Sequence, residues 1–196
     1  MANSDSQRAI EVYGDSISSG IAVEYPFSGV QDPIGDKSDL ANAYYSYGSI
    51  LAREYDAEVS LVAQAGISLV DGFSRNKLWQ DIGGETIYDK VKPLQDADLW
   101  NFNNYSPDLV IIAYGQNDAA SVADNLSKEE WKGRYKQMIA NLRAKHPDSY
   151  FIGMFPAMFH NPQWDSYITE AIAEYRLENN DEKIFSLIHQ QLTPGH

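Results

Sequence analysis

Short apolar runs alternate with polar and glycine-containing stretches along this chain. Runs of this length, bounded by turn residues, are typical of β-strands. They predict strands at about residues 9–13, 58–64, 109–114, 150–155 and 183–187. The run at 109–114 is continuously apolar and rich in β-branched side chains, which is typical of a strand covered on both faces. We therefore expect this strand at the centre of a sheet.

Apolar residues at helical spacing lie between the predicted strands. They predict helices at about residues 42–55, 85–92, 127–146 and 165–179. The third helix is the best defined, because Ser127 and Glu130 have the form of a capping box at its start and Pro147 follows its end. Asp165 is expected to cap the fourth helix.

The order of these elements predicts the fold class. Strands that alternate with helices favour a parallel sheet, because parallel neighbours need crossover connections. We expect an α/β protein, a three-layer α/β/α sandwich with a parallel sheet of about five strands. Residues 1–7 are expected to be a lead-in without regular structure, and residues 8–196 a single domain.

Composition narrows the possible partners and chemistry. The chain has 196 residues, of which 43% are hydrophobic, enough for one buried core. Its 28 acidic and 15 basic residues give a net charge of −13, which argues against a nucleic acid partner. No cysteine is present, so disulfides, thiolate metal sites and cysteine nucleophiles are excluded.

Membrane and targeting signals are not evident in the sequence. No apolar run approaches the roughly 20 residues of a membrane span, so no membrane partner is expected. The first residues, Met-Ala-Asn-Ser-Asp, lack the basic and apolar regions of a signal peptide. Because a leader can be removed, this leaves the location of the protein open.

Polar or glycine-containing turns follow three of the predicted strands. Gly14-Asp15-Ser16 follows the first, Gly66 the second and Asn117 the third. Ligands of open parallel sheets collect beyond the carboxyl ends of the strands, so these turns predict one site. Each residue also has a purely structural interpretation: a turn hydroxyl for Ser16, a left-handed turn for Gly66 and an Asx-turn for Asn117.

Taken together, the three turns could hold a developing negative charge on oxygen. The backbone N–H groups of Ser16 and Gly66 and the side-chain NH2 of Asn117 are all hydrogen-bond donors. Glycine additionally lets a backbone N–H approach a ligand without a Cβ in the way. These donors predict an oxyanion hole beside the Ser16 hydroxyl.

These motifs resemble those of a known family. Gly14-Asp15-Ser16, Gly66 and Gly115-Gln116-Asn117-Asp118 are similar, in order and spacing, to the first three blocks of the SGNH (GDSL) hydrolases. Trp100-Asn101-Phe102 and Tyr105-Ser106-Pro107-Asp108 are similar to the catalytic domain of carbohydrate esterase family 2. The resemblance covers about residues 8–196 and implies a flavodoxin-like fold and ester hydrolysis without a cofactor.

In such an enzyme Ser16 would be the nucleophile, with Asp15 and Asp118 in supporting roles. A histidine must accept the serine proton. Thr193-Pro194-Gly195-His196 resembles the last block of the family, which makes His196 the expected base.

Three other histidines are present. His160 is the second candidate for the base, His189 also follows a predicted strand, and His146 is expected on the opposite side of the sheet. Thr193 stands where the family often carries an orienting aspartate, so the resemblance implies a Ser-His dyad. The family also continues into a closing helix, whereas this sequence ends at the histidine.

Aromatic residues occur in the loops expected around Ser16. They are Tyr25, Phe27, Tyr44, Tyr45, Trp79 and Trp164. Aromatic rings stack on sugars as well as on apolar chains, and Trp164, Tyr45 and His160 are the candidates for substrate binding. The histidines lack ligand-like spacing, so no metal site is expected.

The resemblance implies a bacterial serine esterase, secreted or on the cell surface, that removes O-acetyl groups from a plant-type polysaccharide or its oligosaccharides. Two alternatives remain open: a lipase or thioesterase of the same superfamily, and an inactive carbohydrate-binding module. A nucleotide binder is disfavoured, because no glycine-rich phosphate loop follows the first strand. The sequence does not indicate the oligomeric state.

Overall fold

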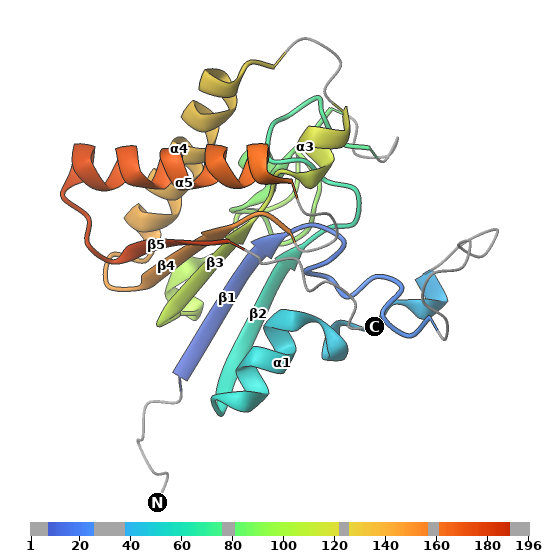
Figure 1. Cartoon of the computed structure of the whole chain (residues 1–196). Helices are drawn as coiled ribbons and strands as arrows, with labels where there is room; N and C mark the ends of the chain where they lie inside the picture. The colour runs from blue at the N-terminus through green and yellow to red at the C-terminus, as the bar shows by residue number, and fades with distance from the viewer. Residues whose placement is uncertain (1–7, 26–37, 76–80, 122–125, 157–160, 189–196) are drawn as a thin grey trace, which may run out of the picture.

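One parallel sheet forms the centre of the molecule (Figure 1). The structure is a computed structural model, and it describes residues 8–25, 38–75, 81–121, 126–156 and 161–188. The strands are β1 (Arg8–Gly14), β2 (Ala57–Ala63), β3 (Leu109–Ala113), β4 (Tyr150–Met154) and β5 (Ile184–Leu187). Their order across the sheet is β2-β1-β3-β4-β5, and all neighbours are parallel. The predicted strands, and the central place of β3, are confirmed.

Helices cover both faces of this sheet, which confirms the three-layer fold. The α-helices are α1 (Tyr47–Glu54), α2 (Gly84–Ile87), α3 (Gln116–Ser121), α4 (Lys128–Lys145) and α5 (Pro162–Asn179). Among the described residues, the short 3-10 helices are η1 (Ser38–Leu40), η2 (Ala43–Tyr45) and η4 (Phe102–Asn104). In Figure 1, α4 and α5 lie on one face of the sheet and α1 lies on the other.

Alternation along the strands divides the core between the two faces. Tyr13 of β1 and Ile112 of β3 belong to the larger cluster, which includes the buried residues of α4 and α5. Val12 and Ile111, one position earlier on each strand, belong to the smaller cluster beside α1. Successive side chains of a strand point to opposite faces, so each strand contributes to both layers.

The two long helices begin at well-defined caps. Ser127 and Glu130 form the predicted capping box before α4. The cap of α5 is Asn161, whose side chain accepts a hydrogen bond from the N–H of Trp164. The prediction that Asp165 caps this helix is wrong, because the helix begins at Pro162, a residue suited to the first helical turn.

Two other predicted helices are shorter than expected. The helix predicted at 42–55 is interrupted at Ser46, whose backbone is extended and whose side chain caps α1. The helix predicted at 85–92 ends at Ile87. After it, residues 89–100 fold back on themselves through a bridge between Lys90 and Leu99.

Candidate active site

The carboxyl ends of three neighbouring strands are level with each other. Gly14 at the end of β1 pairs with Ala63 of β2 on one side and with Ala113 of β3 on the other. The N–H of Gln64, just beyond β2, donates to the Gly14 carbonyl at 3.2 Å. The register therefore places the turns after β1, β2 and β3 along one edge of the sheet, as predicted.

Ser16 lies in a hydrogen-bonded turn directly after β1. The Ser19 N–H donates to the Asp15 carbonyl, and the Ile21 N–H to the Ser16 carbonyl, each at 3.0 Å. The Asp15 carboxylate accepts the Ile17 N–H at 3.0 Å. These bonds fix the turn on both sides of Ser16, which is partly exposed.

Gly14 is needed where the strand passes into this turn. A Cβ at this position would clash with the Ser18 side chain and contact the Ala113 carbonyl. The Ser18 side chain is itself held, because its hydroxyl is hydrogen-bonded to Tyr47 at 2.8 Å. The close packing of turn, β3 and α1 thus requires a residue without a side chain.

Gly66 adopts the left-handed conformation, with φ of +78°, which glycine tolerates best. Its carbonyl accepts the Arg75 N–H at 2.8 Å. Within the described residues, neither the Gly66 N–H nor the Ser16 N–H donates a hydrogen bond. No group in the described ranges therefore competes with a ligand for these two donors.

Asn117 lies in the first turn of α3 and is 7% exposed. Its side-chain NH2 donates to Asp15 Oδ2 at 3.1 Å and to the Ile67 carbonyl at 2.8 Å. The amide thus links the turns after β1 and β2. Both of its hydrogens are engaged, so a contact with an oxyanion would have to replace one of these bonds.

Asp118, next to Asn117 in α3, forms hydrogen bonds to two other segments, the one after Gly66 and α4. Its carboxylate accepts the N–H groups of Leu69 at 2.9 Å and Val70 at 3.1 Å, as well as the indole N–H of Trp131 at 3.1 Å. Asp118 is completely buried. The carboxylate therefore joins the segment after Gly66 to α4.

Burial raises the pKa of both carboxyl groups. The pKa of Asp15 rises to about 7 through burial, an effect opposed by the hydrogen bond from Ile17 and increased by the charge of Asp118. Burial raises the pKa of Asp118 to about 6, against the three hydrogen bonds that it accepts. The candidate site thus holds two carboxyl groups that titrate near neutral pH.

The proposed sugar-binding aromatic residues differ in their placement. Tyr45 is 49% exposed, and its ring meets Tyr44 edge-on. Trp164 is only 7% exposed and packs in the core against Trp131, with 5.0 Å between ring centroids. The expectation of an accessible Trp164 is therefore corrected: apolar burial of its ring in the core leaves no open face for stacking on a sugar.

The described part of the chain contains one histidine, His146. It is buried at the end of α4, with Nε2 3.0 Å from Glu11 Oε2 and its ring against Phe102. This places it away from the carboxyl edge of the sheet, as expected. His160, His189 and His196 lie outside the described residues, and so do Phe27 and Trp79.

An apolar hollow of about 540 Å³ lies beside the Ser16 turn. Its lining includes Ile17 and Ile21 of that turn, Tyr45, and Met154 at the end of β4. No pattern along the chain indicated this hollow, because its walls come from segments that are distant in the sequence. In the described ranges no group of three acidic, histidine or cysteine side chains could hold a metal ion. Among the described helices, none has the length and apolar character of a membrane span.

Comparison with known proteins adds independent information. The model of the GDSL-like Lipase/Acylhydrolase family matches residues 12–181. The chain is 28% identical, over 186 residues, to the Cellulase/esterase CelE of Acetivibrio thermocellus, covering 91% of this chain and 21% of that protein. It is 26% identical, over 183 residues, to an Acetylxylan esterase / glucomannan deacetylase of Cellvibrio japonicus, covering 91% of this chain and 48% of that protein.

The fold is also that of a solved carbohydrate esterase. A family two carbohydrate esterase from Clostridium thermocellum, in complex with cellohexaose, matches with a TM-score of 0.78 and 25% identity. The match covers 96% of this chain and 56% of that one. The chain therefore spans less than half of the length of each curated relative and just over half of the solved one.

Proposed function

The chain belongs to the GDSL-like lipase/acylhydrolase family, and we propose that it is a carboxylic ester hydrolase that removes O-acetyl groups from carbohydrate. The observation that carries this proposal is the arrangement around Ser16. A partly exposed serine lies on a hydrogen-bonded turn, and the N–H groups of Ser16 and Gly66 have no partner within the described residues. This is the arrangement that acyl transfer to serine requires.

In this reaction, the Ser16 hydroxyl oxygen attacks the acetyl carbonyl while a histidine accepts the hydroxyl proton. The carbonyl oxygen gains negative charge, which the N–H groups of Ser16 and Gly66 stabilise. Collapse of the tetrahedral intermediate breaks the bond to the sugar oxygen, which takes the proton from the histidine. Water then attacks the acetyl-serine, aided by the same histidine, and releases acetate.

Asn117 is the proposed third donor to the oxyanion. Its NH2 group is already directed toward the turns that carry Ser16 and Gly66 by its bonds to Asp15 and Ile67. The longer bond, to Asp15 at 3.1 Å, is the one that we expect the oxyanion to replace. Asp15 and Asp118 act as positioning residues, since each binds backbone N–H groups of a turn at the site.

His196 is the proposed base, with His160 as the second candidate. The position of His146 supports this choice indirectly, because its ring is buried against Glu11 and Phe102. A dyad without a third acid suits the sequence, in which Thr193 precedes the histidine at the position where the family often has an aspartate.

The names of the relatives support a carbohydrate ester as the substrate. They include an acetylxylan esterase / glucomannan deacetylase and a carbohydrate esterase in complex with cellohexaose. Exposed Tyr45 offers a ring for a sugar. A polysaccharide substrate is too large to enter a cell, so we also propose that the protein works outside it, secreted or at the surface.

The decisive experiment compares Ser16→Ala with Ser19→Ala, a serine of the same turn. Ser16→Ala should lower kcat on an aryl acetate and on acetylated xylan by more than about 10³-fold. Ser19→Ala should stay within about threefold of wild type. A fluorophosphonate should label wild type at Ser16. Sugar binding without labelling would instead indicate an inactive carbohydrate-binding module.

The apolar hollow favours a second candidate, a lipase or thioesterase. Ile17 of the Ser16 turn contributes to its wall, so a long acyl chain could lie there. Aryl esters of increasing chain length distinguish the two candidates. A deacetylase should prefer acetate, and a kcat/KM that rises with chain length to octanoate would support the lipase.

A further inference from the structure

We propose that the cavity between β2 and the loop at residues 89–100 is a subsite for an acidic sugar unit, a hexuronate, of the carbohydrate substrate. This inference rests on the proposed function, since it names the substrate class of that site. The cavity has a volume of about 240 Å³. Because sites for drug-sized ligands usually have about 300–1,000 Å³, this one suits a single sugar ring.

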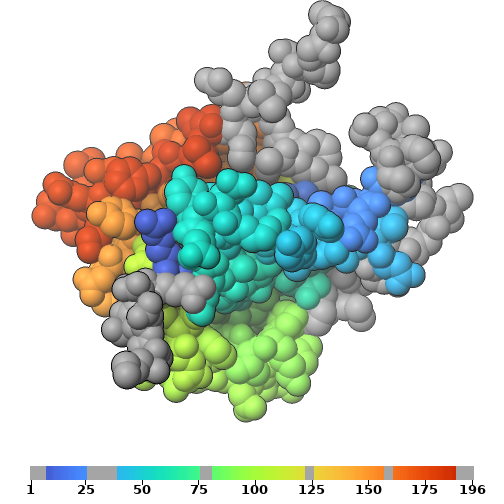
Figure 2. All heavy atoms as spheres, turned by 90° about the horizontal axis from the view of Figure 1, so that it is seen from below, coloured from blue at the N-terminus to red at the C-terminus, as the bar shows by residue number. Residues whose placement is uncertain are grey.

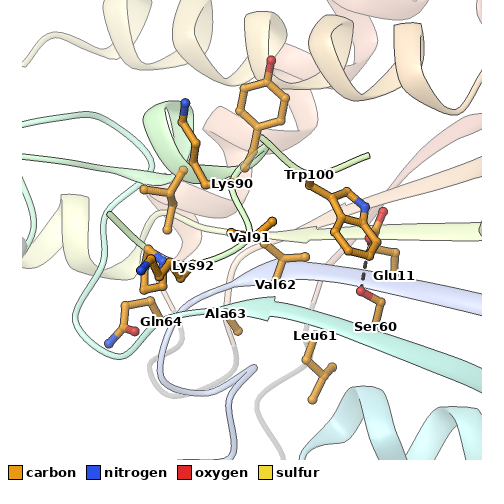
Figure 3. A pocket seen from close by; sticks show the side chains of 13 residues that line it. Glu11, Ser60, Leu61, Val62, Ala63, Gln64, Lys90, Val91, Lys92 and Trp100 are labelled. Carbon is orange, nitrogen blue, oxygen red and sulfur yellow. Dashed lines mark hydrogen bonds between the residues drawn. The ribbon is translucent and has the colours of Figure 1, made fainter. Parts of the chain in front are cut away.

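The two ends of the cavity have different chemistry, as Figure 3 shows. At one end the indole of Trp100 lies near Glu11 and Ser60. At the other end lies Lys92, close to Gln64, while the Lys90 side chain, which also lines the cavity, points its ammonium group away from Gln64. A ligand with a ring to stack and a carboxylate to pair matches this arrangement.

The two lysines supply the charge that a carboxylate needs. The Lys90 ammonium is 3.9 Å from the Asp89 carboxylate, so its charge is only weakly compensated. Lys92 is exposed and has no ion pair with any carboxylate in the described ranges. In a chain of net charge −13 such a pair is unusual. It gives this cavity a local positive potential that attracts an anionic group.

The opposite end of the cavity holds hydrogen-bond acceptors, the carboxylate oxygens of Glu11. Glu11 is 1% exposed, and its carboxylate accepts hydrogen bonds from Tyr13 at 2.9 Å and Ser60 at 3.2 Å, while Oε2 also lies 3.0 Å from His146 Nε2. Oε1 accepts the Ser60 hydroxyl, and a carboxylate oxygen can accept a second bond. Sugar hydroxyl groups beside an indole ring find both an acceptor and a stacking surface here.

The loop at residues 89–100 carries Trp100 as well as Lys90 and Lys92, and so contributes to both ends of the cavity. The Val91 N–H donates to the Asp98 carbonyl at 3.0 Å, and the Trp100 N–H donates to the Asp89 carbonyl at 2.8 Å. Lys90 and Leu99 form a bridge between these two bonds. These bonds thereby hold the backbone of Trp100 beside the backbone of the segment that carries Lys90 and Lys92. Figure 2 shows this excursion (green) beside the segment that contains α1 and β2 (teal).

The cavity also adjoins the proposed reaction centre. Its lining runs along β2 from Ser60 to Gln64. Gln64 donates its N–H to Gly14, two residues before Ser16, and is itself two residues before Gly66. A uronate held here would therefore lie next to the ester that Ser16 attacks. The subsite would select acetyl groups close to acidic branches of a polysaccharide.

The test uses Lys92→Glu, with Lys183→Glu as the matched control at the opposite edge of the sheet. Lys183 is an exposed lysine that reaches Asp148. The substrates are an acetylated xylo-oligosaccharide with a glucuronic acid branch and the same compound with that carboxyl group reduced to an alcohol. Lys92→Glu should raise KM for the acidic substrate about tenfold. It should leave the reduced substrate and an aryl acetate within about twofold, and Lys183→Glu should change none of them.

An equal effect of Lys92→Glu on both oligosaccharides, or no effect on either, would overturn the proposal. Calorimetric binding of the two oligosaccharides tests the subsite independently of the proposed esterase activity. Lysine-dependent preference for the acidic compound in a protein without esterase activity would retain the subsite and reject the enzyme. Equal esterase activity on the acidic and the reduced substrate would retain the enzyme and reject the subsite.

Discussion

The side-chain amide of Asn117 donates a hydrogen bond of 3.1 Å to Asp15 Oδ2, between residues 102 positions apart in the sequence. Asp15 also accepts the Ile17 N–H, within the turn that presents Ser16. Through this contact the start of α3 and the turn after β1 hold each other in position. The proposed oxyanion donor and the proposed nucleophile are therefore oriented by the same buried carboxyl group.

Asn117→Ala should lower kcat by about 10²–10³-fold with little change in KM, because an oxyanion donor acts mainly in the transition state. The kinetics of aryl acetate hydrolysis measure this. Asn141→Ala, on α4, removes a surface asparagine that accepts a bond from Gln137 and should have no effect. A proportionate rise in KM at constant kcat would assign Asn117 to substrate binding instead.

Asp15→Asn should change how stability depends on pH. In the folded protein the pKa of Asp15 is about 7, against a usual value of 3.8. Between these values the folded protein holds a proton that the unfolded chain has lost. This contribution to stability is complete below pH 3.8 and is lost as pH rises to about 7, by at most about 1.4 kcal/mol per pH unit.

Urea denaturation at pH 5, 6, 7 and 8 tests this prediction. Asp118 titrates near pH 6, so the decline of wild-type stability between pH 6 and 7 should come mainly from Asp15. The Asp15→Asn variant should lose the slope between pH 6 and 7, and below pH 6 it should keep only the share that comes from Asp118. Identical slopes in both proteins would show that Asp15 is ionised throughout this range.

Asp118→Asn should destabilise the protein by about 1–3 kcal/mol, since an amide oxygen replaces only one of the two acceptor oxygens. Either the Leu69 N–H or the N–H of Val70 is then left without its buried partner. A midpoint of unfolding unchanged by Asp118→Asn would contradict the role of Asp118 as the link to this segment.

Two glycine-to-alanine changes should have opposite effects on stability. A Cβ at Gly133, in α4, meets nothing within 4 Å, so Gly133→Ala should stabilise the helix by up to about 1 kcal/mol. Gly66 has φ of +78°, so Gly66→Ala should destabilise the protein by about 1 kcal/mol and lower activity by displacing an oxyanion donor. Thermal melts and aryl acetate kinetics measure both. Full activity in Gly66→Ala would remove Gly66 from the oxyanion hole.

Residue patterns along the chain were sufficient to predict the elements of the fold and the order of the motifs. The apolar runs of β1, β3 and β4 and the capping box of Ser127 are local signals, and each lies where it was predicted. Parallel pairing then follows from the alternation of strands and helices, and it brings Ser16, Gly66 and Asn117 to one edge of the sheet.

Contacts between distant segments determine which side chains are accessible at that edge. Trp164 looks like a loop aromatic in the sequence, but the side chains of α4 bury it beside Trp131. The partners of Asn117 and Asp118 lie about 50 residues or more away in the sequence, apart from Trp131. The cavity beneath Trp100 exists because one short loop folds back onto β2. These features depend on contacts between segments that are far apart in the sequence. Local residue patterns predict each segment but not which side chains of different segments meet.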